Sequence, residues 1–596
     1  MLFCIVPSIT LWRTHPYIEP SYAPSLVVGG LERRGFNVRY VDLNLLMNSW
    51  QREAPQLSRD TTEFLHDWPE TLLTTENCPS DLDVVLTRMT SYLSDARPNY
   101  LAFSIDRITT IYEIFHAQFG FAIALSRRLR ELHRVPVVWG GQIVRRIGYG
   151  AIRSHLQKTP EPYVDFLFFG DGALSLPLLL SALETDDRTF SALRAHLNRT
   201  REPVVWIPSP RTWVDLEEPT SHESPPAEDP ASRFQEFELL QIQPSFRAAN
   251  RQLYLTSLGR LFPTVRTGAW GEQPIALYPY KFMYGCSHKC AFCKSANQSL
   301  VVRPVREVVD DLQRLVEEQG IDCFRFFNAQ INYSAQYVRE FCREIIRRRL
   351  KVCFSDSASL RNLDQELCSL LREAGCVKLW FGVESPVERI LGLIHKEMAS
   401  ADARSALRTA HDAGIWVGVN IIVGFPHETD SEFAEVCRFV EEQKEIADCW
   451  QFSALEVHKN TPMADRPADY GIELHHPYTQ ADPLYGYAFS EIGGLNWKER
   501  ELRAVEREGV LGKLVNPKVH RFHLNDYLVF ALYREYGDKS VVRRELTRYV
   551  NEIKDRIGLG TASRWLTPKR VFDEDLPDLI QRTLNSERPR ESGNAS

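Results

Sequence analysis

The sequence Cys286-Ser-His-Lys-Cys290-Ala-Phe-Cys293 places three thiols within one short stretch. Soft thiolate ligands suit iron–sulfur clusters, and such clusters normally take four cysteines. Three cysteines on one tight loop therefore leave one iron open to bind and reduce another molecule. Gly285 directly precedes the triad and allows a sharp backbone turn after an apolar approach. The spacing predicts a cluster-binding loop at the end of a β-strand.

Zinc is the alternative metal that these thiols could bind, because half of the pattern is a CxxC pair. No second CxxC and no paired histidines follow in the sequence at the spacing of a zinc finger. His288 lies inside the loop, where it either supports the ligands or faces solvent. The sequence favours an iron–sulfur cluster and leaves zinc open.

Composition indicates an ordinary globular chain of two to four domains, with 596 residues, 25% charged and 44% hydrophobic. A net charge of −7 argues against nucleic acid as the main partner. Twelve cysteines at irregular spacings read as reduced thiols rather than a disulfide framework. The apolar first dozen residues lack a basic leader and read as a buried strand, and no apolar run reaches the roughly 18 residues of a membrane span. These features predict a cytoplasmic protein.

Short apolar strands alternate with helical stretches over residues 1 to about 205, and glycines follow several strand ends. This alternation predicts a doubly wound parallel sheet, whose ligand crevice lies at the carboxyl ends of the strands. Glycines at such an edge allow a bulky ligand to approach the backbone. The relevant stretches are 2–6, 25–34, 37–42, 100–104, 117–133, 135–141 and 165–172.

Three further regions follow. Residues 206–269 read as a linker and an inter-domain segment, because 208–232 is rich in proline, serine and glutamate. Residues 270–455 repeat six β/α units and predict a partial parallel (β/α)6 barrel with its site at the C-terminal strand ends. Residues 456–596 read as a mainly helical domain with a disordered polar tail. The fold class expected for the whole chain is therefore α/β.

The cysteine triad resembles the pattern shared by the radical S-adenosylmethionine (SAM) superfamily, in which it follows the first barrel strand. Gly382-Val-Glu384-Ser385 is similar to the GxES stretch that ends the fourth strand of many members, and Lys396 follows as a lysine often does there. The stretch from Asn420 to Thr429 resembles the fifth-strand xGFPxET segment. The region 1–205 looks like the cobalamin-binding domain fused to one large subgroup, which includes the class B-type radical SAM methyltransferases.

This resemblance implies a 4Fe–4S cluster, SAM and cobalamin as cofactors. Cys286, Cys290 and Cys293 would ligate the cluster, and SAM on the open iron would be cleaved to a 5′-deoxyadenosyl radical. The positions that match SAM contacts are Phe292, Asn328, Gln330, Ser357, Glu384, Ser385 and Asn420. The positions that match cobalamin contacts are Ser104, Gly140, Gly141, Gly170 and Gly172. The resemblance assigns no catalytic acid, base or radical-quenching residue.

Two departures from the family pattern stand out. Phe327-Asn-Ala-Gln330 occupies the place where the superfamily often has Gly-Gly-Glu, whose glutamate holds the SAM amino group. Asn328 or Gln330 would then supply a carbonyl oxygen instead. The DxHxxG motif of domains that bind cobalamin through a histidine is missing from the sequence, and His66 is more simply a surface or packing residue than a cobalt ligand.

The function that the resemblance implies is cobalamin-dependent methylation of an unactivated carbon in a natural product or peptide. Two alternatives stay open. One is a radical SAM and cobalamin enzyme that catalyses rearrangement, ring contraction or cyclisation without methylation. The other is a cobalamin-binding sensor or scaffold with a structural cluster. The expected partners are a small-molecule or peptide substrate and an external electron donor such as flavodoxin or ferredoxin, without nucleic acid or membrane.

Overall fold

The computed structural model describes most of the barrel region and parts of the rest. The described ranges are 1–5, 20–43, 80–105, 114–141, 163–169, 172–185, 204–209, 212–215, 238–247, 274–396, 400–475, 487–515 and 522–547, with isolated residues between them.

The N-terminal region is a seven-stranded sheet in the order β2-β1-β3-β4-β5-β6-β7. Its first five strands are parallel, as the sequence predicted. They are β1 (Leu2–Ile5), β2 (Arg39–Asp42), β3 (Leu101–Ser104), β4 (Val137–Gly140) and β5 (Phe166–Phe168). The accompanying helices are α2 (Tyr22–Arg33), α5 (Ser80–Leu93), α6 (Ile114–His133) and α8 (Ser175–Leu183).

The doubly wound parallel sheet carries an antiparallel addition at one edge. Strands β6 (Val204–Ser209) and β7 (Thr212–Asp215) form an antiparallel hairpin that joins β5. The boundary predicted at residue 205 falls inside this hairpin, and β7 lies in the stretch that read as a linker. Pro208 lies within β6, where the β6–β7 register is irregular between Trp206 and Ser209, and prolines are tolerated at such irregularities.

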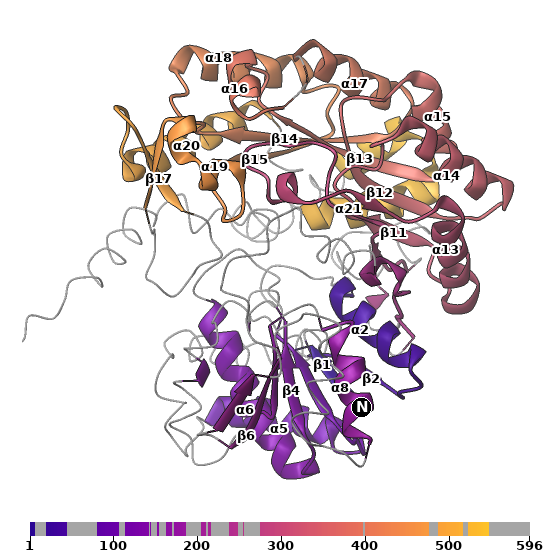
Figure 1. The fold of residues 1–596 in the computed structure, drawn as a ribbon. Coiled ribbons are helices and arrows are strands. Elements are labelled where there is room, and N and C mark those ends of the chain that lie inside the picture. Colours follow the sequence, from indigo (N-terminus) through magenta and orange to yellow (C-terminus); the bar gives the residue numbers. More distant parts are fainter. Residues whose placement is uncertain are drawn as a thin grey trace, which may run out of the picture.

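The barrel region contains six parallel strands in the order β15-β14-β13-β12-β11-β8, as the six predicted β/α units require. The strands are β8 (Tyr278–Tyr280), β11 (Cys323–Phe326), β12 (Cys353–Ala358), β13 (Cys376–Glu384), β14 (Trp416–Val423) and β15 (Cys449–Ala454). The helices between them are α13 (Val305–Gln319), α14 (Ala335–Arg347), α15 (Gln365–Glu373), α16 (Glu388–Leu393), α17 (Ser400–Asp412) and α18 (Asp430–Gln443). In Figure 1 this region lies above the N-terminal sheet, whose strands are drawn in indigo to magenta.

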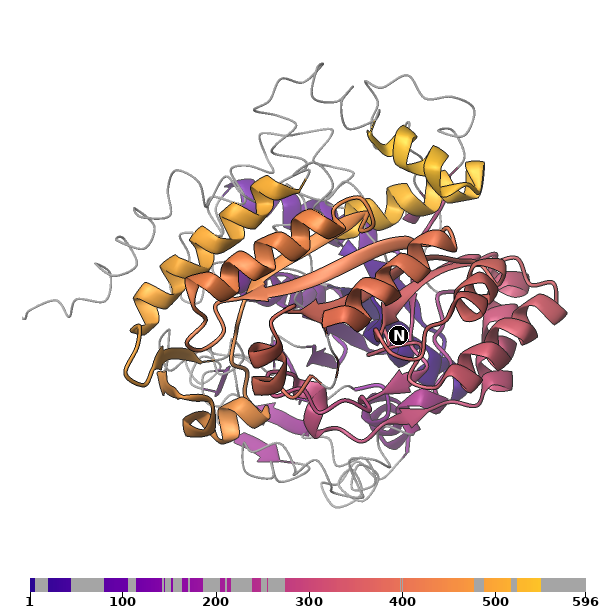
Figure 2. The same cartoon turned by 90° about the horizontal axis from the view of Figure 1, so that it is seen from above.

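The C-terminal region begins with α19 (Pro462–Asp465) and contains a hairpin that the sequence did not predict. Strands β16 (Ile472–His475) and β17 (Ala488–Glu491) pair antiparallel. Helices α20 (Trp497–Leu514) and α21 (Phe522–Tyr536) follow, in line with the expected helical character. Figure 2 shows α20 running beside α18 on the outside of the barrel sheet.

The two sheets share one hydrophobic core. Buried residues of α2 and α8 belong to the same apolar cluster as those of the barrel. The segment 238–247 lies between them: the Phe246 ring contacts the Tyr278 ring at 5.0 Å, and the Ser245 N–H donates to the Ser25 carbonyl. On α2, the Tyr22 hydroxyl donates to the Lys281 carbonyl at 3.0 Å. The N-terminal region is therefore packed against the strands that lead into the cysteine loop.

Among the described helices, none is both long and apolar enough to cross a membrane.

Candidate active site

The cysteine triad lies on a loop closed by a short ladder, at the end of a strand as predicted. Strand β9 (Met283–Tyr284) pairs antiparallel with β10 (Val301–Val302), and the loop between them holds the three cysteines. Gly285 has φ +69°, and a Cβ there would overlap the Ser299 carbonyl oxygen. The turn into the loop therefore requires glycine.

We expect Gly285→Ala to destabilise the fold by about 1–3 kcal/mol, since a strained backbone and a backbone clash coincide at this position. Iron bound per chain after anaerobic reconstitution should fall as well. Gly392→Ala is the matched control, because a Cβ at Gly392 meets no atom within 4 Å. Equal iron content and equal urea midpoints in the two variants would show that the turn tolerates a side chain.

Neighbouring strand-end loops hold the cysteine loop from two sides. The Ala291 N–H donates to the Ile394 carbonyl at 2.9 Å, and its carbonyl accepts from the Met463 N–H at 2.9 Å. Cys290 is 8% exposed, whereas Cys286 and Cys293 are partly exposed. Burial raises the pKa of the Cys290 thiol to about 11, a cost that a positively charged metal cluster would remove by binding the thiolate.

The arrangement of the described side chains bears on which metal group the three thiols could hold. In the described part of the chain, no three His, Cys, Asp or Glu side chains converge closely enough to hold one metal ion. A mononuclear zinc site requires such convergence. In a cube each cysteine binds a different iron atom, so the ligands stand farther apart.

Gln330 lies beside the loop, where the superfamily pattern often has glutamate. Its side chain is 3% exposed, and its Nε2 donates to Ser287 Oγ at 2.6 Å. The Ser357 carbonyl accepts from the Ile331 N–H at 2.8 Å, which places the tip of β12 next to Gln330. Gln330 therefore points toward the cysteine loop, and its carbonyl oxygen is the acceptor that this position offers.

Asn328 has another use. Its Oδ1 accepts from the N–H groups of Phe282 and Met283 at 3.1 and 3.2 Å, and its Nδ2 donates to Asp356 Oδ2 at 2.7 Å. Both polar atoms of the amide are thus engaged with protein groups just before the cysteine loop. This geometry makes Asn328 a support for the loop rather than a direct SAM contact.

Asp356 is a residue that sequence reasoning missed. It is 2% exposed on β12, and its Oδ1 accepts from the N–H groups of Asn328 and Ser357 at 3.1 and 2.8 Å. Burial raises the pKa of Asp356 to about 8, against the opposing effect of these donors. The only sequence signal is a single acidic residue within the strand Cys-Phe-Ser-Asp-Ser-Ala.

We expect the raised pKa of Asp356 to make stability depend on pH. The charged carboxylate is disfavoured in the folded state, so the free energy of unfolding should fall as pH rises from about 4 to about 8 and then level off. Asp356→Asn should lack this slope, whatever its absolute stability. Urea unfolding of both proteins at a series of pH values measures the difference, and parallel pH profiles would contradict this assignment.

Glu384 and Lys396 form an ion pair at the end of β13. Lys396 Nζ lies 3.1 Å from Glu384 Oε1, and Glu384 has φ +63°. A Cβ at Gly382 would overlap this carboxylate, which explains the glycine two residues earlier. Burial disfavours the charged ammonium, but Glu384 and Cys290 outweigh it and raise the pKa of Lys396. A carboxylate and an ammonium therefore stand together beside the cysteine loop.

The remaining predicted SAM contacts lie toward the carboxyl ends of the barrel strands, the end of the sheet that we call the barrel mouth. Asn420 is the register partner of Gly382, and its buried Oδ1 accepts no hydrogen bond from the described residues. Ser385 is 1% exposed, and its Oγ accepts from the Val387 N–H, which starts α16. Phe292 is partly buried against the core next to Cys293. Asn420 thus offers an unused acceptor, whereas Ser385 is partly committed to a turn.

The predicted cobalamin contacts gather at the carboxyl edge of the N-terminal sheet. Ile5, Ser104 and Gly140 are successive register partners across β1, β3 and β4. Gly141 has φ +105°, and a Cβ there would lie 2.6 Å from the Ile105 carbonyl oxygen. Gly172 has φ +71° and open space around it. Gly170 and His66 lie outside the described residues.

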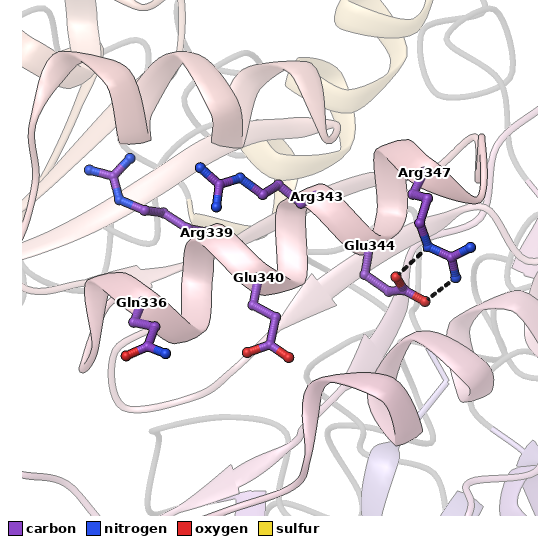
Figure 3. A pocket seen from close by; sticks show the side chains of 6 residues that line it. All are labelled: Gln336, Arg339, Glu340, Arg343, Glu344 and Arg347. Atoms are coloured by element: carbon purple, nitrogen blue, oxygen red, sulfur yellow. Dashed lines mark hydrogen bonds and ion pairs between the residues drawn. The ribbon is translucent and has the colours of Figure 1, made fainter.

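A surface hollow of about 500 Å³ lies along α14 (Figure 3). Arg347 donates to both carboxylate oxygens of Glu344 at 2.7 Å, and Arg339 pairs with Asp364 at 2.6 Å. The hollow is an open helix face lined by ion pairs. Its lining residues are Gln336, Arg339, Glu340, Arg343, Glu344 and Arg347.

Comparison with known proteins agrees with this geometry. Residues 280–440 match the family model of the radical SAM superfamily. This region is a radical SAM domain. The match begins at the last residue of β8, includes the triad and strands β11 to β14, and ends within α18.

Curated relatives match over shorter lengths. The chain is 29% identical over 183 residues to the anaerobic magnesium-protoporphyrin IX monomethyl ester cyclase of Cereibacter sphaeroides, covering 29% of this chain and 30% of that protein. It is 26% identical over 294 residues to the cytidylyl-2-hydroxyethylphosphonate methyltransferase of Streptomyces wedmorensis, covering 48% of this chain and 53% of that protein. The chain thus spans about half or less of these two relatives.

A solved structure matches over nearly the whole chain. It is the radical SAM methyltransferase TsrM from Kitasatospora setae, with cobalamin and a [4Fe-4S] cluster bound. The TM-score is 0.57 at 17% identity, covering 92% of this chain and 99% of TsrM. The match shows that the N-terminal sheet, the barrel and the C-terminal region together form a known architecture.

Proposed function

We propose that this chain is a cobalamin-dependent radical SAM methyltransferase that acts on an unactivated carbon of a natural product or peptide. The observation on which the proposal rests is the presence of two such strand-end edges in one chain. The cysteine loop lies at the carboxyl ends of the barrel strands, and a glycine-lined edge ends the parallel strands of the N-terminal sheet. TsrM, which shares this fold, holds a cluster and cobalamin.

Residues at the barrel mouth suit the polar parts of SAM. Gln330 and Asn420 offer carbonyl oxygens to the SAM amino group and ribose, and the Glu384–Lys396 pair offers both charges. Cys286, Cys290 and Cys293 would hold the cluster, and Ser104, Gly140, Gly141 and Gly172 would lie against cobalamin. When bound, the cluster supplies an electron to SAM and cobalamin carries a methyl group. The protein's own contribution is to hold these groups in register and to keep water out.

The test is an anaerobic assay of the reconstituted protein with methyl-labelled SAM and a candidate substrate. We expect label in the product together with 5′-deoxyadenosine. An external reductant is required, and we propose flavodoxin or ferredoxin as its natural source. Formation of 5′-deoxyadenosine without any methylated product would remove the methylation claim and leave the radical chemistry standing.

A second candidate keeps the radical and drops methylation. It is favoured by the similarity to the cyclase of Cereibacter sphaeroides, whose name describes ring formation. In that case the substrate is cyclised or rearranged, and labelled methyl groups stay out of the product. Mass spectrometry of the product separates the two, because methylation adds a CH2 unit and rearrangement adds none.

The sensor or scaffold alternative requires a fourth cysteine close to the triad. A structural cluster is expected to have four protein ligands. Cys323, Cys353 and Cys376 are the first residues of β11, β12 and β13, at the opposite ends of the strands from the triad. None of these three is positioned to be the fourth ligand.

A further inference from the structure

Two cysteines meet at the base of the barrel, away from the cluster loop. Cys323 opens β11, Cys353 opens β12, and the two residues are direct partners in the parallel ladder. Side chains of register partners point to the same face of a sheet, and adjacent strands lie about 4.8 Å apart. Disulfides join residues whose Cα atoms are about 4.4–6.8 Å apart.

The surroundings of the pair make one thiol the nucleophile. Cys353 is partly exposed, whereas Cys323 is 1% exposed. Interaction with the neighbouring Cys323 thiol lowers the pKa of the Cys353 thiol, against its burial and Asp322, and Arg534 and Arg372 act in the same lowering direction. Every other described cysteine whose thiol pKa departs from its usual value has it raised. Reactive thiols are those that are partly exposed, close to cations and beside a second cysteine.

We propose that Cys353 and Cys323 are an oxidisable thiol pair that a peroxide converts to a disulfide between β11 and β12. The Cys353 thiolate attacks one peroxide oxygen, the O–O bond breaks, and Cys353 becomes a sulfenic acid. The Cys323 sulfur then attacks the Cys353 sulfur, the S–S bond forms, and water leaves. Two thiols lose two electrons and two protons, and one hydrogen peroxide becomes two waters. This modification site does not depend on the proposed methyltransferase activity.

The experiment is peptide mapping of the full chain after anaerobic treatment with one equivalent of hydrogen peroxide, acid quench and alkylation. Trypsin places Cys323 in Leu315–Arg325 and Cys353 in Val352–Arg361, so each thiol lies in its own peptide. We expect these two peptides to be recovered joined, with both cysteines protected from alkylation. The same result is expected in a chain with Cys286, Cys290 and Cys293 replaced by alanine, where no cluster iron takes part.

Cys437 on α18 is the matched control. It is also partly exposed, but burial raises the pKa of its thiol. With limiting iodoacetamide, Cys353 should be alkylated at least about five times faster than Cys437. In Cys323→Ser, peroxide should leave a trappable sulfenic acid on Cys353 and no disulfide there. Equal labelling of Cys353 and Cys437, or peroxide-induced disulfides only at other cysteines, would overturn the proposal.

Discussion

Replacing Cys290 with alanine is expected to reduce 5′-deoxyadenosine formation by more than about a thousandfold, a loss of about 4 kcal/mol in transition-state stabilisation. Cys290 is the most buried of the three cysteines, and its loop is held by Ile394 and Met463. An alanine at this position offers no ligand to the cluster, so an iron is lost or left exposed. Electron transfer to SAM requires an intact cluster at a fixed distance.

The measurement pairs iron and sulfide content with product formation under the same anaerobic conditions. Cys437→Ala provides the control, since this partly exposed thiol on α18 lies outside the triad. It should keep full cluster content and full activity. A Cys290→Ala protein that retains both would mean that the triad does not hold the catalytic cluster, and the proposed function would fall with it.

The barrel was predictable because several of its strands can be recognised from their own sequence, without knowledge of their partners. Strands β13 and β14 are runs made mostly of apolar residues, such as Cys376–Glu384, which is interrupted by Lys378. Parallel strands covered on both faces show this pattern. The radical SAM resemblance then depended on motifs at strand ends, which are local in the sequence as well.

The two hairpins were not predictable from the same signals. Strand β7 follows Pro208 and Pro210, and such a stretch reads as a linker unless the neighbouring strand is known. Strands β16 and β17 have only four residues each and are separated by residues 476–487. Such short strands are stabilised by hydrogen bonds to the partner strand, and the sequence of one strand alone does not indicate which segment it pairs with.

The roles of Asn328 and Asp356 depended on contacts between distant residues. The sequence places Asn328 where the family binds the SAM amino group, but it cannot show that Asp356 lies within hydrogen-bond distance. Asp356 lies two residues after Phe354 on β12, and Phe354 is the register partner of Phe324 on β11. A carboxylate is not expected so close to two buried phenylalanines. Inter-strand register decides that the two side chains meet, and this register is set by the whole sheet.

Breaking the ion pair between Lys378 on β13 and Asp526 on α21 is expected to have the largest effect on stability. The side chains are 0% and 1% exposed, and Lys378 Nζ lies 4.4 Å from the centre of the Trp380 ring. Removing one partner leaves a buried charge without compensation, which costs about 3–5 kcal/mol. Lys378→Ala and Asp526→Ala should each lower the urea midpoint accordingly.

A double replacement distinguishes two contributions to the free energy of unfolding: the cost of leaving one buried charge unpaired, and the net stabilisation from the intact ion pair. Lys378→Met with Asp526→Leu removes both charges and keeps apolar volume, so most of the lost stability should return. Lys444→Ala, which breaks an exposed pair with Glu441, is the matched control and should change the free energy of unfolding by less than about 1 kcal/mol. If the double variant is as unstable as the single ones, side-chain packing of Lys378 rather than its charge holds α21 against the base of the barrel.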